Sequence, residues 1–157
     1  MSLNGVMVLH VLFVCTGNTC RSPMAEHIFN HLAKEKRLPF IATSAGIAAL
    51  EGAPAAPNTS KALEKLGITL VHHQARNITE EMIENAHWII TMTEAQRQNL
   101  LKRFPRHADK VVLLGALCDD PREVDDPFGG SLPTYERCAR QLQDMIAEAL
   151  PKLTERQ

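Results

Sequence analysis

Aromatic residues are scarce in this chain: they make up 4% of its 157 residues, with a single Trp and a single Tyr. Neither sign of charge is in excess, because 17 Lys and Arg stand against 18 Asp and Glu. This balance argues against a nucleic-acid partner, which requires a basic face. No apolar run is long enough to cross a bilayer, and the first residues lack the basic segment and cleavage site of a secretory signal. We therefore expect a cytoplasmic protein without a membrane partner.

Cysteine is also sparse, and the irregular spacing of Cys15, Cys20, Cys118 and Cys138 does not suit a disulfide framework. We expect these thiols to be reduced. Internal repeats, low-complexity tracts and linkers are lacking as well. The sequence therefore predicts a monomer with one domain over residues 1–157, in which residues 1–5 form a disordered extension ahead of a start near Met7.

Apolar runs alternate with helical patterns along the chain. The run from Val6 to Val14 predicts a strand that is buried on both faces of a sheet. Pro23 then suits the first turn of a helix, with Ser22 as its cap. Further strands are predicted at 40–44, 88–92 and 111–114, and further helices at 58–66, 79–85, 94–103 and from Ser131 onward. This alternation predicts an α/β fold: a parallel sheet with helices on both faces, whose ligands bind beyond the carboxyl ends of the strands.

The loop after the first strand carries the chemistry. Cys15 and Arg21 enclose five residues whose backbone N–H groups can surround one anion, and Gly17 and Asn18 tolerate the left-handed backbone of such a nest. The following helix points its positive end at the same space, and Arg21 offers a bidentate fork. These donors favour a Cys15 thiolate, a nucleophile that needs no general base. We predict a phosphate-binding loop made of Thr16, Gly17, Asn18, Thr19, Cys20, Arg21 and Ser22, in which Ser22 donates its hydroxyl proton to the sulfur.

These residues allow two other interpretations. A Cys and an Arg five residues apart occur often by chance, but their place between a buried strand and a Pro-started helix favours a phosphate loop. A zinc site of Cys15, Cys20, His27 and His31 is disfavoured because the cysteine spacing is too long for a knuckle. The helix would also carry both histidines away from the loop. We therefore expect neither a metal nor a cofactor.

Five motifs resemble those of the low-molecular-weight protein tyrosine phosphatases and occur in that family's order. They are VCTGNTCRSPMAE at 14–26, TSAG at 43–46, HHQAR at 72–76, ITMTEAQ at 90–96 and DPFGG at 126–130. The resemblance implies a four-stranded parallel sheet and a metal-free mechanism with a phosphocysteine intermediate. It also implies that Asn18 and Ser44 brace the loop, and that His73 supports it with Glu26 as its partner.

A phosphatase needs an acid that protonates the leaving group. Two Asp-Asp-Pro runs, at 119–121 and 125–127, offer one, because proline holds the preceding residue extended and projects its carboxyl group. The residues alone leave both runs open, as well as the possibility that each is a solvated loop. The family resemblance points to Asp126, which precedes Pro127 and Phe128, as the acid of the first step and the base of the second. Asp120 is the second choice.

The expected substrates are phosphorylated proteins, and the composition of the cleft suggests which kind. Phosphotyrosine binding uses an aromatic sandwich, yet this chain has Ala48 and Ala49 after SAG and only Phe128 after the Asp-Pro. Thr19 stands where tyrosine-specific relatives usually carry a bulky aliphatic residue, and its hydroxyl can bind a guanidinium. The motifs look most like the bacterial protein arginine phosphatase branch. We therefore expect phosphoarginine specificity, set by Thr19 and Phe128, with phosphotyrosine as the alternative.

Two remoter classes share features of the loop. A thioredoxin-coupled arsenate reductase would need further cysteines near the third strand, where this chain reads Met92-Thr93-Glu94. A phosphocarrier or binding module would have no use for both Arg21 and an Asp-Pro acid. The sequence also predicts redox sensitivity, because Cys20 lies close enough in the chain to capture an oxidised Cys15 as a disulfide.

Overall fold

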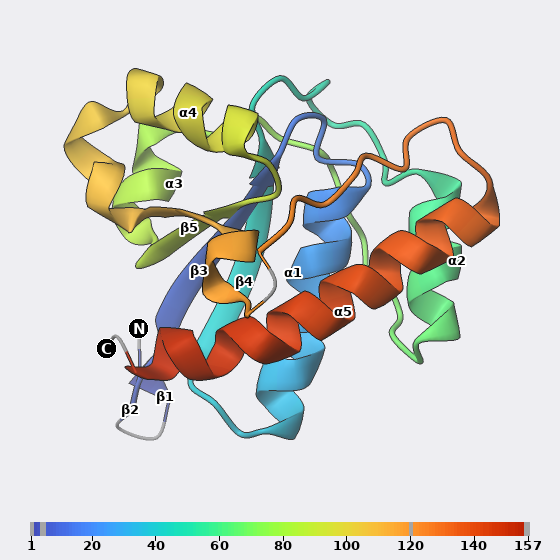
Figure 1. Cartoon of the computed structure of the whole chain (residues 1–157), viewed down its shortest axis with the longest axis horizontal. Coiled ribbons are helices and arrows are strands. Elements are labelled where there is room, and N and C mark those ends of the chain that lie inside the picture. Colours follow the sequence, from blue (N-terminus) through green and yellow to red (C-terminus); the bar gives the residue numbers. More distant parts are fainter. Residues whose placement is uncertain (1, 4–5, 120, 156–157) are drawn as a thin grey trace.

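The computed structural model describes residues 2–3, 6–119 and 121–155. Four parallel strands cross its middle in the order β4-β3-β5-β6 (Figure 1). They are β3 (Leu9–Cys15), β4 (Phe40–Gly46), β5 (Trp88–Thr91) and β6 (Val111–Leu113). The central position of β3 buries its last five residues, as the apolar run predicted. The expected four-stranded parallel sheet is confirmed.

Helices cover both faces of the sheet, also as expected (Figure 1). One face packs against α1 (Arg21–Glu35), α2 (Pro57–Lys65) and α5 (Leu132–Glu155), around a core that includes Phe13 and Phe29. The other face packs against α3 (Glu80–Asn85) and α4 (Glu94–Arg103), around a smaller core that includes Leu12 and Ile89. Successive residues of β3 point to opposite faces, and for this reason Leu12 and Phe13 belong to different cores.

The first predicted strand is divided in the structure. Val6–Met7 forms β2, which pairs antiparallel with β1 (Ser2–Leu3), whereas the parallel sheet starts at Leu9. The division falls just before Leu9, which pairs with Phe40, the first residue of β4. Among the described residues, β3 has no parallel neighbour before that point. Ser2 and Leu3 of the expected extension are thus in a strand, and Met1, Asn4 and Gly5 lie outside the described residues.

Of the helices α1 to α4, two start at a side chain that caps them. Thr79 accepts a hydrogen bond from the Met82 N–H at the start of α3, and Thr93 forms a capping box at the start of α4. The prediction for α1 is wrong, because this helix begins at Arg21 and Ser22 lies inside it. Cys20 occupies the N-cap position, but its side chain makes no capping hydrogen bond, and the Ser22 hydroxyl bonds to Cys15 and Asn18 instead.

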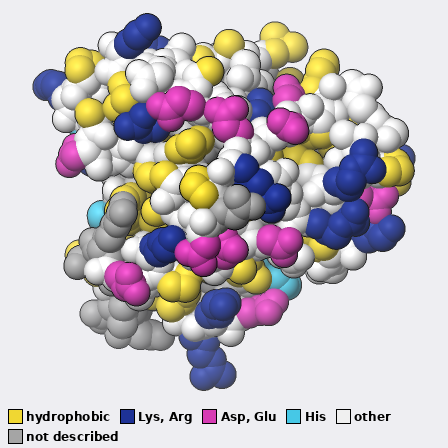
Figure 2. All heavy atoms as spheres, viewed as in Figure 1, with side chains coloured by type: hydrophobic (Ala, Val, Ile, Leu, Met, Phe, Trp, Pro, Cys, Tyr) yellow, Lys and Arg dark blue, Asp and Glu magenta, His cyan; other side chains and the backbone are white. Residues whose placement is uncertain are grey.

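Two short 3-10 helices, η1 (Pro105–Lys110) and η2 (Leu114–Leu117), flank β6. Basic and acidic side chains are intermixed on the face shown in Figure 2, in keeping with the balanced charge of the chain. Within the described part of the chain, no helix combines the length and the hydrophobicity needed to span a membrane.

Candidate active site

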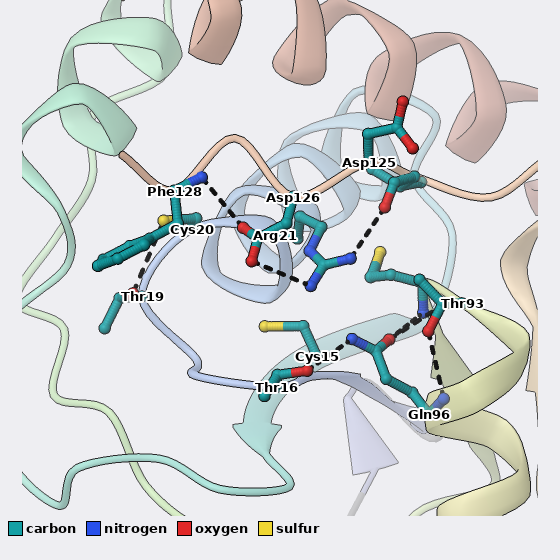
Figure 3. Close-up of polar contacts among 12 residues, drawn as sticks. Cys15, Thr16, Thr19, Cys20, Arg21, Thr93, Gln96, Asp125, Asp126 and Phe128 are labelled. Carbon is teal, nitrogen blue, oxygen red and sulfur yellow. Dashed lines mark hydrogen bonds and ion pairs between the residues drawn. The ribbon is translucent and has the colours of Figure 1, made fainter. Parts of the chain in front are cut away.

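The loop between β3 and α1 curls around the side chain of Cys15 (Figure 3). Cys15 ends the central strand and is 3% exposed, and the backbone N–H of Asn18 donates to its Sγ at 3.3 Å. Asn18 adopts a left-handed backbone with φ of 57°, as expected. Gly17 does not, so the prediction that both residues use this region holds only for Asn18. Helix α1 begins at Arg21, so the positive end of its dipole lies at the loop.

The Asn18 side chain is fully buried and is the hub of the loop. Its Nδ2 donates to Ser22 Oγ at 2.8 Å and to Ser44 Oγ at 3.0 Å. Its Oδ1 accepts from the Arg76 N–H at 3.0 Å. The amide thus connects the loop to α1, to β4 and to the segment that follows α2. This arrangement agrees with the bracing role expected of Asn18 and Ser44.

These bonds orient the serine protons. Ser22 Oγ lies 2.9 Å from Cys15 Sγ and already accepts from Asn18, so its proton is free to point at the sulfur. Ser44 likewise accepts from Asn18, and its hydroxyl donates to Glu26 Oε1 at 2.6 Å. The direction of each bond is therefore set by the amide, which can only donate through its nitrogen.

The predicted pairing of His73 with Glu26 is wrong. His73 Nε2 donates instead to the Asn18 carbonyl oxygen at 2.7 Å, and Glu26 accepts from Ser44. Both side chains still support the loop, but each contacts a different atom of the bracing network. The two residues line the same small cavity behind the loop without forming an ion pair.

The end of β4 lies against the loop because of Gly46. A Cβ at this position would stand 2.6 Å from the Thr16 carbonyl oxygen. That oxygen accepts from the Ala48 N–H at 3.0 Å, and the Cys15 carbonyl accepts from the Ile47 N–H at 2.9 Å. A side chain at Gly46 would displace the loop, which explains the glycine of the TSAG motif.

Arg21 and Asp126 face each other at the opening of the pocket (Figure 3). The Arg21 guanidinium is nearly buried: its Nη1 donates to the Val124 carbonyl at 2.9 Å, and its Nη2 lies 3.6 Å from Asp126 Oδ2. The Asp126 side chain is 53% exposed, and its other oxygen accepts from the Phe128 N–H at 3.1 Å. The guanidinium is held in place while the carboxylate remains open to solvent and to a ligand.

The pocket has a volume of about 210 Å³. Its walls are Cys15, Thr16, Gly17, Asn18, Thr19, Cys20, Arg21, Asp126 and Phe128. Ligand pockets for drug-sized molecules run from about 300 Å³ upward, so this one has room for a phosphoryl group and the atoms next to it. The rest of a substrate would lie outside, beside the exposed ring of Phe128. Ala48 and Ala49 are not among its walls.

The Asp-Pro run at 119–121 is not at the pocket in its described part. Asp119 is exposed and pairs with Lys152 of α5 at 3.5 Å, and it is not part of the pocket. Asp120, the second choice for the acid, lies outside the described residues. The structure brings Asp126 to the loop, whereas Asp119 of the other run lies away from it.

The predicted loop cysteine Cys20 is buried, and its Sγ lies 3.4 Å from the hydroxyl of Tyr135. Burial, together with the contact to Cys20, raises the pKa of Tyr135. Burial also raises the pKa of Cys118 to about 11 and that of Cys138 to about 12. Cys118 and Cys138 are therefore neutral thiols at physiological pH, and both pack in the hydrophobic core.

The four residues of the disfavoured zinc site do not form a cluster of ligand atoms. His27 Nδ1 is bonded to the Pro23 carbonyl at 2.8 Å, and His31 pairs with Glu35 at 2.6 Å. Among the described residues, the only group whose ligand atoms lie close enough for one metal ion is Glu80, Glu84 and His107 on the other side of the sheet. Cys15, Cys20, His27 and His31 thus form no such group.

Sequence reasoning missed the contact between Thr16 and Gln96. Gln96 belongs to the capping box of α4, and its Nε2 donates to Thr16 Oγ1 at 3.2 Å (Figure 3). The only sequence signal was the glutamine of the ITMTEAQ motif, three residues after the Thr93 cap. Its capping role could be read from this spacing, but its reach to a loop 80 residues away could not.

Known proteins resemble this chain over nearly its whole length. Among curated sequences, a protein-arginine-phosphatase of Bacillus subtilis (strain 168) is 36% identical over 146 residues, which is 92% of this chain and 97% of that one. Among solved structures, a low molecular weight protein tyrosine phosphatase from T. tengcongensis has a TM-score of 0.89 at 37% identity, covering 92% of this chain and 99% of its own.

A mutant of the arginine phosphatase YwlE with a phosphorylated active-site serine has a TM-score of 0.88 at 35% identity, covering 93% of this chain and 96% of that one. The family model for low molecular weight phosphotyrosine protein phosphatase matches residues 10–157. This match takes in both the loop that holds Cys15 and the segment that holds Asp126, and the chain therefore belongs to the low molecular weight phosphotyrosine protein phosphatase family.

Proposed function

We propose that this phosphatase hydrolyses phosphoarginine in proteins, with Cys15 as the nucleophile that carries the phosphoryl group. The observation that carries the proposal is the convergence of the Cys15 thiol, the Arg21 guanidinium and the Asp126 carboxylate on one small pocket. We further propose that residues 1–157 form one phosphatase domain that works in the cytoplasm as a monomer. Its substrates are phosphorylated proteins, and neither a metal nor a nucleic acid takes part.

In the first step, the Cys15 thiolate attacks phosphorus while the Arg21 fork binds two phosphoryl oxygens. The S–P bond forms and the P–N bond of phosphoarginine breaks, with its electron pair passing to the guanidine nitrogen. Asp126 supplies the proton that this nitrogen needs. The 3.6 Å between Arg21 Nη2 and Asp126 Oδ2 supports these roles, because both groups then border the same phosphoryl group.

In the second step, water attacks the phosphocysteine and Asp126 accepts its proton. The S–P bond breaks and its electron pair returns to the Cys15 sulfur, while inorganic phosphate leaves. The developing thiolate accepts the proton of the Ser22 hydroxyl as a hydrogen bond, which the 2.9 Å distance permits. The Asn18 N–H, 3.3 Å from the same sulfur, adds a second donor.

The choice of phosphoarginine rests on the walls of the pocket. Thr19 and Asp126 can pair with a guanidinium, and Phe128 is the only aromatic residue among the lining residues. A guanidinium is planar and carries N–H donors, whereas the ring of phosphotyrosine requires apolar walls. The relatives named protein-arginine-phosphatase from Bacillus subtilis and Geobacillus stearothermophilus, at 36% and 34% identity, support the same choice.

Phosphotyrosine is the second candidate, because one observation favours it. The Phe128 ring is 73% exposed at the rim of the pocket, where it could stack on a substrate ring. Several relatives in the same range of identity are named protein-tyrosine-phosphatases, including one from Escherichia coli (strain K12) at 33%. Only a comparison of the two substrates on the same enzyme separates the candidates.

The mechanism is tested first. Cys15→Ser should abolish turnover of a generic aryl phosphate, and orthovanadate should inhibit the wild type. A chelator should leave activity unchanged, because the proposed chemistry uses only side chains. Activity that is lost to a chelator and restored by zinc or magnesium would contradict the proposal.

Specificity is tested by the ratio of kcat/KM for phosphoarginine and phosphotyrosine peptides of the same sequence. The wild type should prefer phosphoarginine. Thr19→Ile removes a polar partner and adds apolar bulk beside the pocket, so it should lower kcat/KM for phosphoarginine and spare or raise it for phosphotyrosine. A wild type that prefers phosphotyrosine would assign the enzyme to the tyrosine-specific members of the family.

A further inference from the structure

Thr16 is the loop residue that follows the nucleophile, and its hydroxyl is held from outside the loop. Gln96 Oε1 accepts from the backbone N–H groups of Met92 at 3.0 Å and Thr93 at 3.1 Å. The oxygen of the amide is thereby identified, and its Nε2 must be the atom that faces Thr16 Oγ1 at 3.2 Å (Figure 3). Gln96 is 5% exposed, so this orientation is fixed by burial as well as by bonding.

The direction of this bond decides what Thr16 can offer a ligand. An amide nitrogen only donates, so Thr16 Oγ1 accepts with one lone pair and keeps the other lone pair and its own proton. Among the described residues, the only hydrogen bond of the Thr16 hydroxyl is the one it accepts from Gln96. Thr16 is exposed and lines the pocket next to Cys15. Its unused proton and lone pair are therefore available at the reacting group.

The contact is not needed to start α4. The capping box uses the Thr93 side chain and the Gln96 oxygen, and both functions would be complete without Thr16. The Gln96 Nε2 group takes no part in the cap. Its hydrogen bond to Thr16 connects α4 to the phosphate-binding loop. A valine has the shape of threonine and would fill the same space without the hydroxyl, so a substitution by valine removes the contact with Gln96 alone.

We propose that Thr16, oriented by Gln96, is a further specificity-determining residue of the pocket beside Thr19 and Phe128, an inference that rests on the proposed function. Its free lone pair accepts an N–H of the substrate guanidinium, and its proton is donated to a phosphoryl oxygen. Phosphoarginine carries such N–H groups beside phosphorus, whereas the phenyl ring of phosphotyrosine carries none. Thr19 and Thr16 then provide polar atoms at two separate places in the pocket wall.

The test compares Thr16→Val, which removes the hydroxyl and keeps the shape, with Thr16→Ser, which keeps the hydroxyl. The measurement is kcat/KM for matched phosphoarginine and phosphotyrosine peptides. Leaving a guanidinium N–H unpaired should lower the phosphoarginine-to-phosphotyrosine ratio of Thr16→Val by about tenfold or more. Thr16→Ser should retain most of the wild-type ratio. Thermal unfolding of each variant shows whether it is folded, and Thr16→Ala replaces Thr16→Val if the latter is not.

The outcomes separate this inference from the function on which it rests. If the wild type prefers phosphoarginine and Thr16→Val lowers both kcat/KM values equally, or neither, Thr16 is only a structural residue and the inference is overturned while the proposed function stands. If Thr16→Ser loses as much of the ratio as Thr16→Val, the hydroxyl is not the cause and the inference is overturned as well. If the wild type prefers phosphotyrosine, both proposals fail together.

Discussion

Asn18 Nδ2 donates a 2.8 Å hydrogen bond to Ser22 Oγ, and this single bond decides which way the serine proton points. An amide nitrogen has no lone pair to offer, so the serine must accept here and donate elsewhere. The atom that remains for it is the Cys15 sulfur, 2.9 Å away. A residue that braces the loop therefore also directs a proton donor at the proposed nucleophile.

Ser22→Ala should slow the second chemical step more than the first. The hydrogen bond stabilises the thiolate that is released when the phosphocysteine is hydrolysed, and a bond to a charged group is worth about 1.5–3 kcal/mol. We expect hydrolysis of the intermediate to fall by roughly 10- to 150-fold. Rapid-mixing measurements with an aryl phosphate should then reveal a burst of the released alcohol before the steady state.

Ser60→Ala is a suitable control for this experiment, because Ser60 lies on α2 and is not part of the pocket. It should behave as the wild type does. Equal slowing of the burst and of the steady state in Ser22→Ala would mean that the serine acts on loop geometry and not on the leaving thiolate.

Asp126→Asn should lower turnover of an aryl phosphate by about two to four orders of magnitude, the range usual for a positioned general acid. The loss should be smaller when the leaving alcohol is strongly acidic, because such a group departs without a proton. Asp120→Asn is the matched substitution in the other Asp-Pro run and should change little. A large loss in Asp120→Asn with a small one in Asp126→Asn would reassign the acid.

Peroxide should inactivate the enzyme reversibly, and Cys20 should be the reason. Oxidation converts the Cys15 thiolate to a sulfenic acid, and attack by Cys20 then forms a disulfide and releases water. Cys20 must leave its contact with the Tyr135 hydroxyl, 3.4 Å away, to do so. Cys20→Ser should therefore lose the activity that a thiol reductant recovers in the wild type.

Cys138→Ser is the control for that experiment, since a pKa of about 12 keeps Cys138 a neutral thiol at the pH of the assay. Its recovery should match that of the wild type. Equal recovery in Cys20→Ser as well would show that Cys20 is only a packing residue.

Alkaline pH should destabilise the fold through its buried thiols. An unfolded cysteine has a pKa of about 8.5, whereas burial raises that of Cys138 to about 12. The unfolded state therefore loses a proton that the folded state keeps, and the free energy of unfolding falls as pH rises above about 8.5. Urea unfolding at a series of pH values should give a shallower fall for Cys138→Ala. An unchanged slope would mean that this thiol titrates alike in both states.

Much of the fold follows from local pattern. The buried run before Cys15 predicted the central strand, and the helices predicted at 79–85 and 94–103 start where expected. Strand periodicity and helix capping, by Thr79 and Thr93, involve neighbours in the chain. The start of α1 was placed wrongly for the opposite reason. Ser22 has the chemistry of a cap, but it lies inside the helix, and its hydroxyl bonds to Cys15 and Asn18 of the folded loop.

The sequence by itself determined the residue types of the candidate site, since Cys15, Arg21 and the loop between them are contiguous and the Asp-Pro runs are visible as motifs. The family resemblance pointed to Asp126, but tertiary structure alone decided that its carboxylate lies 3.6 Å from Arg21, that Glu26 binds Ser44 and not His73, and that Gln96 reaches Thr16. These contacts join segments between 18 and 105 positions apart, as the residue numbers show. A hydrogen bond between such segments forms only if the donor–acceptor distance is correct to within a few tenths of an ångström. Only the packing of the helices on the sheet sets that distance.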